Sequence, residues 1–326
     1  MTDVVGVVTN GTGGTWRVVA DDGAEYDAVL RGRLKKVDTG RRADGSIRRD
    51  TVSAAEHALK LAVGDRVRLE RDLHANTWAI GEILPRRSRL ARRAPGGGKG
   101  ERVIVANIDQ VLVMFAAAKP EPHPRMLDRF LVIAEANDLA ARVVVNKVEL
   151  VGTDSAHGAF RDYERAGYPV HYISVKQHMG IEPVFHALTG QVSVLTGPSG
   201  VGKSSLLNAL FPGLGLRVSE ISESVNKGRH TTVGAFLQAL PPEMGGAVVD
   251  TPGLREVGLW EFPIERLDSC FPELRELRDD CRFSDCAHMA EPGCAIRGAL
   301  ASGELSGVRY ESYVKLRTEM EEERTM

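Results

Sequence analysis

A glycine-rich segment between two apolar runs constrains this chain more than any other feature. It reads Gly197-Pro-Ser-Gly-Val-Gly-Lys203-Ser204, and its glycines, lysine and serine have the spacing of a phosphate-binding loop. The β-branched run Val192–Leu195 before it predicts a buried strand, and Ser204–Phe211 after it predicts a helix. Glycines let backbone N–H groups turn inward, and a helix start adds positive potential. The segment therefore predicts a phosphate site in an α/β fold.

Two side chains of this loop have predicted tasks. Lys203 is expected to reach the β- and γ-phosphates of a nucleotide, and the Ser204 hydroxyl to ligate Mg²⁺. The alternative is a chance glycine-rich turn, which the strand before it and the helix after it both disfavour. The candidate nucleotide-binding residues of the loop are Gly197, Pro198, Ser199, Gly200, Val201, Gly202, Lys203, Ser204 and Ser205.

Strand-like and helix-like segments alternate from Val103 onward. Val103–Ala117, Arg142–Val145 and Ala247–Val249 are apolar runs that predict strands, and Met126–Leu139 has apolar residues at helical spacing. Such alternation predicts a mostly parallel sheet with helices on both faces. Ligands of these sheets bind beyond the carboxyl ends of the strands.

Two motifs at predicted strand ends bear on the nucleotide, whose base the phosphate loop alone leaves open. Asp250-Thr-Pro-Gly253 places a carboxylate where a Mg²⁺-associated aspartate belongs and a glycine where a γ-phosphate contact belongs. Asn146-Lys147-Val-Glu149 resembles the N-K-x-D motif of GTPases, whose carboxylate accepts two guanine donors that adenine lacks. Ser174-Val-Lys176 resembles the loop that completes the base pocket. We therefore expect GTP and GDP as ligands, with Glu149 replacing the usual aspartate without changing the base preference.

The first 85 residues carry a β pattern. Five short segments rich in Val, Ile, Leu and Trp are separated by turn residues, which fits an OB-fold barrel. The expected strands are Val4–Val8, Thr15–Ala20, Glu25–Leu30, Asp65–Glu70 and Thr77–Leu84. A long polar loop with many arginines and lysines, Arg31–Arg49, follows the third strand. Residues 86–102 are arginine-rich around a Gly-Gly-Gly core and predict a flexible, exposed linker.

Charge is distributed unevenly along the chain. Residues 1–102 hold 20 Lys+Arg against 14 Asp+Glu, whereas the remaining residues hold 22 against 30. The first third is therefore the expected anion-facing part. A solvated basic face with no partner is the alternative reading of the same charge.

A cysteine and histidine cluster lies near the C-terminus, in the pattern Cys281-x4-Cys286-x-His288-x5-Cys294. Four soft or borderline ligands in a closed set fit one tetrahedral structural zinc ion. The alternative is three buried reduced cysteines and a surface histidine. Cys270 lies outside the pattern and is expected to be a small core residue.

The residue after the D-x-x-G motif bears on hydrolysis. Ordinary GTPases have a water-orienting glutamine there, and this chain has Leu254. We therefore expect slow turnover by the isolated protein. His230, within Gly228-Arg-His-Thr-Thr232, is the candidate group that orders the water, unless it is an exposed loop histidine without a role. Either Thr231 or Thr232 is expected to offer the second Mg²⁺ hydroxyl.

The order of the motifs is rotated with respect to an ordinary small GTPase. Asn146–Glu149 comes first, then Ser174, the phosphate loop, Thr231 and Thr232, and Asp250–Gly253. With the flanking domains and the zinc pattern, this order resembles the ribosome small-subunit-dependent GTPase A family over nearly the whole chain. The loop around Arg41–Lys60 is the main part that has no match. The resemblance also supports His230, since the family carries a G-x-H-T-T motif.

The resemblance implies a multidomain fold and a partner. The expected domains are an OB-fold barrel over 1–85, the linker 86–102, a circularly permuted α/β GTPase domain over 103–260, and a helical zinc-binding domain over 261–326. Members of the family act late in maturation of the 30S ribosomal subunit, which stimulates their GTPase activity. We therefore expect binding to this subunit and its 16S rRNA, by a monomer.

The sequence leaves two alternative functions open and indicates a cellular compartment. A passive RNA-binding module with a nucleotide-locked G domain would agree with Leu254, and an ATP-driven enzyme is disfavoured by Asn146–Glu149. The N-terminus has no secretory pattern, and Val111–Ala118 is shorter than the ~20 residues of a membrane span. We therefore expect a cytoplasmic protein without a membrane anchor.

Overall fold

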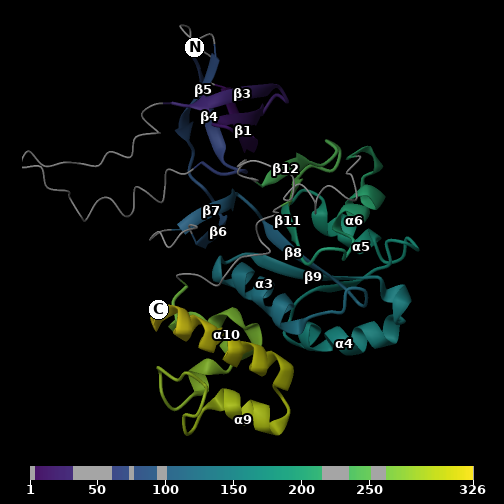
Figure 1. The fold of residues 1–326 in the computed structure, drawn as a ribbon, viewed down its shortest axis with the longest axis vertical. Helices are drawn as coiled ribbons and strands as arrows, with labels where there is room; N and C mark the ends of the chain where they lie inside the picture. Colours follow the sequence, from purple (N-terminus) through teal and green to yellow (C-terminus); the bar gives the residue numbers. More distant parts are fainter. Residues whose placement is uncertain are drawn as a thin grey trace, which may run out of the picture. The chain divides into compact units, whose positions relative to one another are not determined.

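The computed structural model describes residues 4–31, 61–72, 77–93, 101–214, 235–250 and 262–325. They belong to two compact units, shown in Figure 1. The first comprises Met1–Ile108 with Ser222–Gly258, and the second comprises Asp109–Ile221 with Leu259–Met326. None of the helices in these described ranges has the length and hydropathy that crossing a membrane requires.

The N-terminal strands close into a five-stranded barrel, which confirms the prediction. Its order is β1-β2-β3-β5-β4, and its inner face buries Val8, Val18, Ala28, Val67, Leu69 and Ile80. The strands are β1 (Val4–Thr12), β2 (Thr15–Ala20), β3 (Glu25–Leu30), β4 (Arg66–Asp72) and β5 (Thr77–Ile83). β1 runs four residues beyond the predicted Val8. It does so because Gly13 and Gly14, with φ of 60° and 88°, make a two-residue hairpin turn into β2.

The segment after the barrel departs from the flexible linker expected over 86–102. β6 (Arg89–Arg93) pairs antiparallel with β7 (Glu101–Ala106). Arg86 binds the fully buried Asp65 through two hydrogen bonds, from Nε to Oδ1 at 2.6 Å and from Nη2 to Oδ2 at 2.8 Å. Arg86 is therefore bound to Asp65, and Arg89–Arg93 forms a strand rather than a flexible linker. The Gly-Gly-Gly core, within 94–100, lies outside the described residues.

The single strand predicted over Val103–Ala117 is wrong, because two strands occupy this run. β7 ends at Ala106, and β8 (Gln110–Ala116) begins a different sheet. Asn107 between them has a φ of 56°, a left-handed conformation that no strand continues through. Its side chain is held by the barrel unit, because Asn107 Nδ2 donates to the carbonyl of Gly64 at 2.8 Å.

The second unit contains the predicted parallel sheet. β10 (Val170–Tyr172), β9 (Ala140–Asn146), β8 and β11 (Val192–Thr196) lie in this order, and each neighbouring pair is parallel. All residues of β8 are buried, as expected of a central parallel strand. The connecting elements are α3 (Pro124–Ala136), η1 (Val148–Leu150), α4 (Thr153–Arg165), α5 (Glu182–Leu188), α6 (Lys203–Leu210) and η2 (Pro212–Leu214).

Two short strands and a set of helices complete the described chain. β12 (Phe236–Ala239) and β13 (Ala247–Asp250) form an antiparallel pair. The C-terminal region is helical, as predicted, and belongs to the same compact unit as the parallel sheet. Its elements are η4 (Ile264–Arg266), η5 (Asp268–Cys270), α8 (Pro272–Arg275), η6 (Arg278–Asp280), α9 (Ala295–Ser302) and α10 (Gly307–Thr325). Figure 1 shows α10 lying along α3.

Candidate nucleotide site and metal centre

Asn146 joins three of the predicted nucleotide-binding segments. It is the last residue of β9 and only 3% exposed. Its Nδ2 donates to the carbonyl of Val201 in the phosphate loop at 2.8 Å, and its Oδ1 accepts from the backbone N–H of Val175 at 3.1 Å. The structure therefore brings Asn146, the Ser174–Lys176 segment and the phosphate loop together at the carboxyl ends of β9 and β11.

Lys147 fixes the outer side of the phosphate loop. It has a φ of 63°, which turns the chain sharply out of β9. Its Nζ donates to the carbonyl of Gly200 at 2.7 Å and also to the carbonyl of Lys119. The segment after β8 that contains Lys119 is a contact that the sequence motifs did not identify. Its signal is the proline series of Pro120, Pro122 and Pro124, which marks an irregular turn before a helix.

The phosphate loop has a conformation that requires its glycines. Gly197 has a φ of 136°, and a Cβ there would lie 2.0 Å from the carbonyl oxygen of Met114. Gly202 has a φ of 104°, and a Cβ there would lie 2.5 Å from Asn146 Nδ2. The loop is therefore pressed against β8 and β9 with no room for side chains at these two positions.

Lys203 and Ser204 lie at the start of α6, as the motif predicts. Lys203 Nζ donates to the carbonyls of Gly197 at 2.9 Å and Pro198 at 2.7 Å, so the ammonium group lies over the loop. Ser204 is buried in the first turn of the helix. A cationic group above a glycine loop at a helix N-terminus is an arrangement that favours a phosphate anion.

Glu149 has a buried side-chain oxygen that receives no hydrogen bond from the described residues. The residue lies in η1, and its Oε2 is buried without a hydrogen-bond partner among the described residues. A buried, unpaired carboxylate oxygen is costly unless a ligand satisfies it. The two N–H donors of guanine fit this requirement, whereas adenine offers no such pair. Ser174, fully buried, holds the neighbouring loop by accepting from Gln177 N at 3.2 Å.

The remaining predicted nucleotide residues are described only in part. Asp250 is the last residue of β13, where its backbone pairs with Phe236. Gly253, Leu254, His230, Thr231 and Thr232 lie outside the described residues. Their roles therefore stay predictions.

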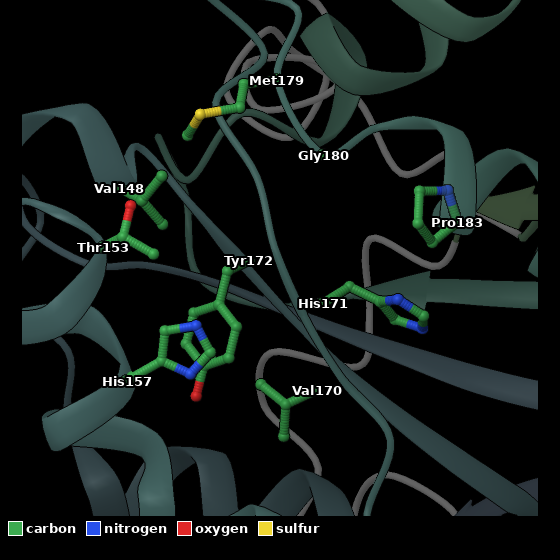
Figure 2. A pocket seen from close by; sticks show the side chains of 9 residues that line it. All are labelled: Val148, Thr153, His157, Val170, His171, Tyr172, Met179, Gly180 and Pro183. Carbon is green, nitrogen blue, oxygen red and sulfur yellow. The ribbon is translucent and has the colours of Figure 1, made fainter.

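A cavity of about 370 Å³ lies beside the predicted base-recognition residues rather than at the phosphate loop. Figure 2 shows its lining, in which the His157 ring lies against Tyr172 while His171 points away from both. The centroids of the His157 and Tyr172 rings are 3.7 Å apart, and the ring planes are tilted by 33°. Val148 is the one residue of the Asn146–Glu149 motif that lines it. The volume therefore does not mark the nucleotide site.

The predicted metal ligands form one cluster. One ligand atom from each of Cys281, Cys286, His288 and Cys294 lies within 4.8 Å of the others. His288 Nδ1 lies 3.6 Å from the sulfur of Cys281 and 3.5 Å from that of Cys294. Three thiols and an imidazole nitrogen at these separations surround a common centre, so the donor set fits a tetrahedral zinc ion.

Asp268 and two tyrosines support this cluster from outside. Asp268 Oδ2 lies 3.3 Å from His288 Nε2, which leaves Nδ1 facing the sulfurs, an arrangement common around metal-binding histidines. Tyr310 donates to the carbonyl of His288 at 2.6 Å, and Tyr313 to that of Ala287 at 2.9 Å. No sequence motif pointed to these three residues, because they lie outside the Cys281–Cys294 segment and make their contacts only through the fold.

Cys270 is separate from the cluster, as expected. It is buried, and its thiol donates to the carbonyl of Arg266 at 3.7 Å. Burial raises the pKa of this thiol to about 12. Cys270 is therefore a neutral core residue rather than a reactive thiolate.

Comparisons with known proteins agree with this geometry. A family model described as RsgA GTPase matches residues 83–260. A Gemmatimonas aurantiaca protein named small ribosomal subunit biogenesis GTPase RsgA is 56% identical over 320 residues, which cover 98% of each chain. A Thermotoga maritima protein of the same name is 41% identical over 261 residues, covering 79% of this chain and 83% of the relative.

Two solved structures resemble the whole chain. YjeQ from Thermotoga maritima matches with a TM-score of 0.72 and 33% identity, covering 98% of both chains. YloQ, described as a circularly permuted GTPase, matches with a TM-score of 0.68 and 26% identity, covering 99% of this chain and 96% of that one. The rotated motif order, the assembled base and phosphate loops and these matches lead to one conclusion: the chain belongs to the RsgA GTPase family and is a GTP hydrolase.

Proposed function

We propose that this protein hydrolyses GTP while it assists the assembly of the small (30S) ribosomal subunit, and that the bound subunit stimulates hydrolysis. The observation that supports this most is the similarity over the full chain to a protein named small ribosomal subunit biogenesis GTPase RsgA. The unpaired Oε2 of Glu149 supports guanine as the base. Small subunits assemble in the bacterial cytoplasm, so we propose that compartment, and a monomer as the acting form.

The nucleotide residues divide the work of binding. Asn146 and Lys147 hold the phosphate loop in place, and Glu149 accepts from guanine. Lys203 exchanges its loop carbonyls for phosphate oxygens, and Ser204 and Asp250 hold Mg²⁺, directly or through water. Bound Mg²⁺ supplies charge neutralisation at the phosphates. Thr231 or Thr232 adds a hydroxyl, and Gly253 a backbone contact to the γ-phosphate.

The zinc ion has a structural role in this proposal. The protein offers four ligands, Cys281, Cys286, His288 and Cys294, so a tetrahedral ion retains no open position for a substrate. The C-terminal region is small, and a region of this size gains much of its stability from the metal. We therefore assign zinc to the folding of the region and not to the chemistry.

The basic first third of the chain is the proposed contact to 16S rRNA. On the barrel, arginines are already paired with carboxylates: Arg17 with Asp27, Arg66 with Asp21 and Arg68 with Glu82. Paired arginines have less charge to offer to phosphates. We assign the binding to Arg31–Arg49 and to the segment 86–102 because arginines are densest there. Arg31 and Arg86 are themselves paired, with Glu70 and Asp65, and residues 32–49 and 94–100 lie outside the described residues.

Sedimentation with purified subunits tests the partner. The GTP-bound protein is expected to pellet with 30S subunits and not with 50S subunits. Phosphate contacts release counterions, so the binding constant should fall steeply between about 50 and 200 mM salt. A variant with Arg41, Arg42, Arg48 and Arg49 changed to Gln should bind more weakly, with a shallower salt dependence. Equal binding to both subunits, or none to 30S, would contradict the proposal.

A further inference from the structure

We infer that α10 couples the metal cluster to the nucleotide site through α3, so that zinc and nucleotide each increase the affinity of the protein for the other. This inference rests on the proposed binding of GTP or GDP and of zinc. Sequence order suggests another connection, because the chain runs from Asp250–Gly253 directly into the C-terminal region. The contacts among the described residues instead connect the C-terminal region to α3, the helix that follows β8.

Arg309 forms the central contact of this connection. It is 1% exposed and lies on α10, yet its guanidinium group binds the fully buried Asp128 of α3. The same group holds Glu273 of α8, from Nε to Oε1 at 2.6 Å and from Nη2 to Oε2 at 3.1 Å. One cation therefore ties three helices together without access to water.

Aromatic rings close the site around Arg309. The guanidinium carbon lies 4.8 Å from the ring centroid of Phe271, 5.3 Å from that of Tyr163 in α4 and 5.8 Å from that of Tyr168. Cations over aromatic faces are attracted by the ring quadrupole, more strongly when water is excluded. The position of α10 on α3 is thus specified, because a shift would leave buried charges unpaired.

Further ion pairs extend the contact along α3. Arg129 pairs with Glu319 near the end of α10. Arg275 of α8 pairs with Glu135, in the last turn of α3, at 3.0 Å. The C-terminal region therefore contacts α3 from its second turn, at Asp128 and Arg129, to its last turn, at Glu135. Figure 1 shows α10 beside α3.

The residues of α10 that directly follow Arg309 contact the metal-binding loop. Tyr310 and Tyr313 donate to the carbonyls of His288 and Ala287, at 2.6 and 2.9 Å. Within five residues, α10 therefore contacts α3 through Arg309 and the backbone of a zinc ligand through Tyr310. A bound zinc ion would fix the position of this backbone. Loss of the zinc ion would therefore alter the surface that α10 contacts.

The other end of α3 meets the nucleotide site. The segment before α3 contains Lys119, whose carbonyl accepts from Lys147 Nζ, and begins at Ala117, whose N–H donates to the carbonyl of Asn146 at 2.8 Å. Pro120 of the same segment lies beside Gly200 of the phosphate loop. A shift of α3 would therefore displace Asn146 and Lys147, the two residues that hold the phosphate loop.

Thermodynamic linkage makes the coupling measurable from both sides. If zinc raises the affinity for nucleotide by some factor, nucleotide raises the affinity for zinc by the same factor. The competing possibility is that the region is docked firmly but without energetic coupling, because a chain of contacts alone does not establish one. Equilibrium measurements on the full chain separate the two possibilities.

The experiment measures binding of a fluorescent GDP to the zinc-loaded and to the chelator-treated protein. We expect the zinc-loaded protein to bind GDP at least about fivefold more tightly than the chelator-treated protein. Competition with a zinc chelator measures the affinity of the protein for zinc. GDP should raise this affinity by the same factor. Equal GDP affinity of the two forms, both folded by circular dichroism, would contradict the inference.

Variants locate the coupling. The double change Tyr310→Phe and Tyr313→Phe removes the hydrogen bonds to the carbonyls of His288 and Ala287, together with the one that Tyr313 accepts from Arg317. It alters no side chain that is proposed to ligate zinc or to contact the nucleotide. It should reduce the coupling factor towards one while both ligands still bind. Arg324→Gln is the matched control on the same helix, because Arg324 is exposed and its ion pair within the described part of the chain is with the exposed Glu265. A Tyr-to-Phe variant with wild-type coupling would exclude α10 as the connection, whereas failure of the zinc-loaded wild type to bind GDP would refute the proposed function itself.

Discussion

Asn146 donates a hydrogen bond of 2.8 Å to the backbone carbonyl of Val201, and so fastens the end of β9 to the predicted phosphate loop. The bond is buried, so each partner depends on the other. This contact gives Asn146 a structural task within the site, in addition to any contact with the nucleotide.

The Asn146→Ala variant should bind GDP about 5- to 150-fold more weakly, because the unsatisfied carbonyl of Val201 costs about 1–3 kcal/mol and the loop loses its anchor. The strand itself should remain, since β9 is held by β8 and β10. Titration of fluorescent GDP measures the loss, and circular dichroism controls for folding. Wild-type affinity would show that the loop is held without Asn146.

A methyl group at Gly197 should displace the phosphate loop. The Gly197→Ala variant would place a Cβ at 2.0 Å from the carbonyl oxygen of Met114, at a φ of 136°, so we expect nucleotide binding to be lost. Gly298→Ala in α9 is the matched control, because nothing lies within 4 Å of its Cβ. That control should bind normally and be about 0.4–1 kcal/mol more stable. Thermal unfolding and GDP titration of both variants check the prediction, and normal binding by Gly197→Ala would contradict it.

Removal of Lys203 or of the Ser204 hydroxyl should abolish hydrolysis in a folded protein. Lys203→Ala removes the ammonium group above the loop, and Ser204→Ala removes a predicted Mg²⁺ ligand, while neither change alters the apolar core. Phosphate release assays measure the effect, with Lys315→Ala, an exposed change on α10, as the control. If either site variant turns over GTP like the wild type, the site assignment is wrong.

Purified protein should contain one zinc ion per chain. Cys281→Ser or Cys294→Ser should lose it, and Asp268→Asn, which alters the partner of His288 Nε2, should weaken metal retention roughly 10-fold or more. Elemental analysis of protein prepared without chelators gives the metal content, and competition with a chelator gives the relative affinity. Protein that is purified without chelators and contains no zinc would exclude the metal assignment.

Sequence predicted those parts of the molecule that local patterns determine. The phosphate loop was identifiable because its strand and helix flank it directly, and the cysteine cluster because its ligands lie within one short segment. The barrel strands were predicted from turn residues, and most of their bounds agree within about two residues, as is usual for local signals.

What the sequence did not reveal depends on contacts between distant residues. Val103–Ala117 is continuously apolar, so nothing local shows that Asn107 adopts a left-handed conformation and divides it. Arg86 looked like a solvated linker residue until the fold brought it to Asp65. The pair of Arg309 and Asp128 is 181 residues apart in sequence, and no periodicity connects them.

The measurement that tests the central claim most directly is the rate of GTP hydrolysis with and without purified 30S subunits. Leu254 occupies the place of the water-orienting glutamine, so the protein alone should turn over slowly. The 30S subunit is expected to raise the rate by roughly 10-fold or more, by ordering the segment around His230 so that its imidazole reaches the attacking water. His230→Ala should lose most of this stimulation while it binds GTP and the subunit normally. A wild-type rate that 30S subunits leave unchanged would contradict the account and favour a passive RNA-binding protein with a locked nucleotide.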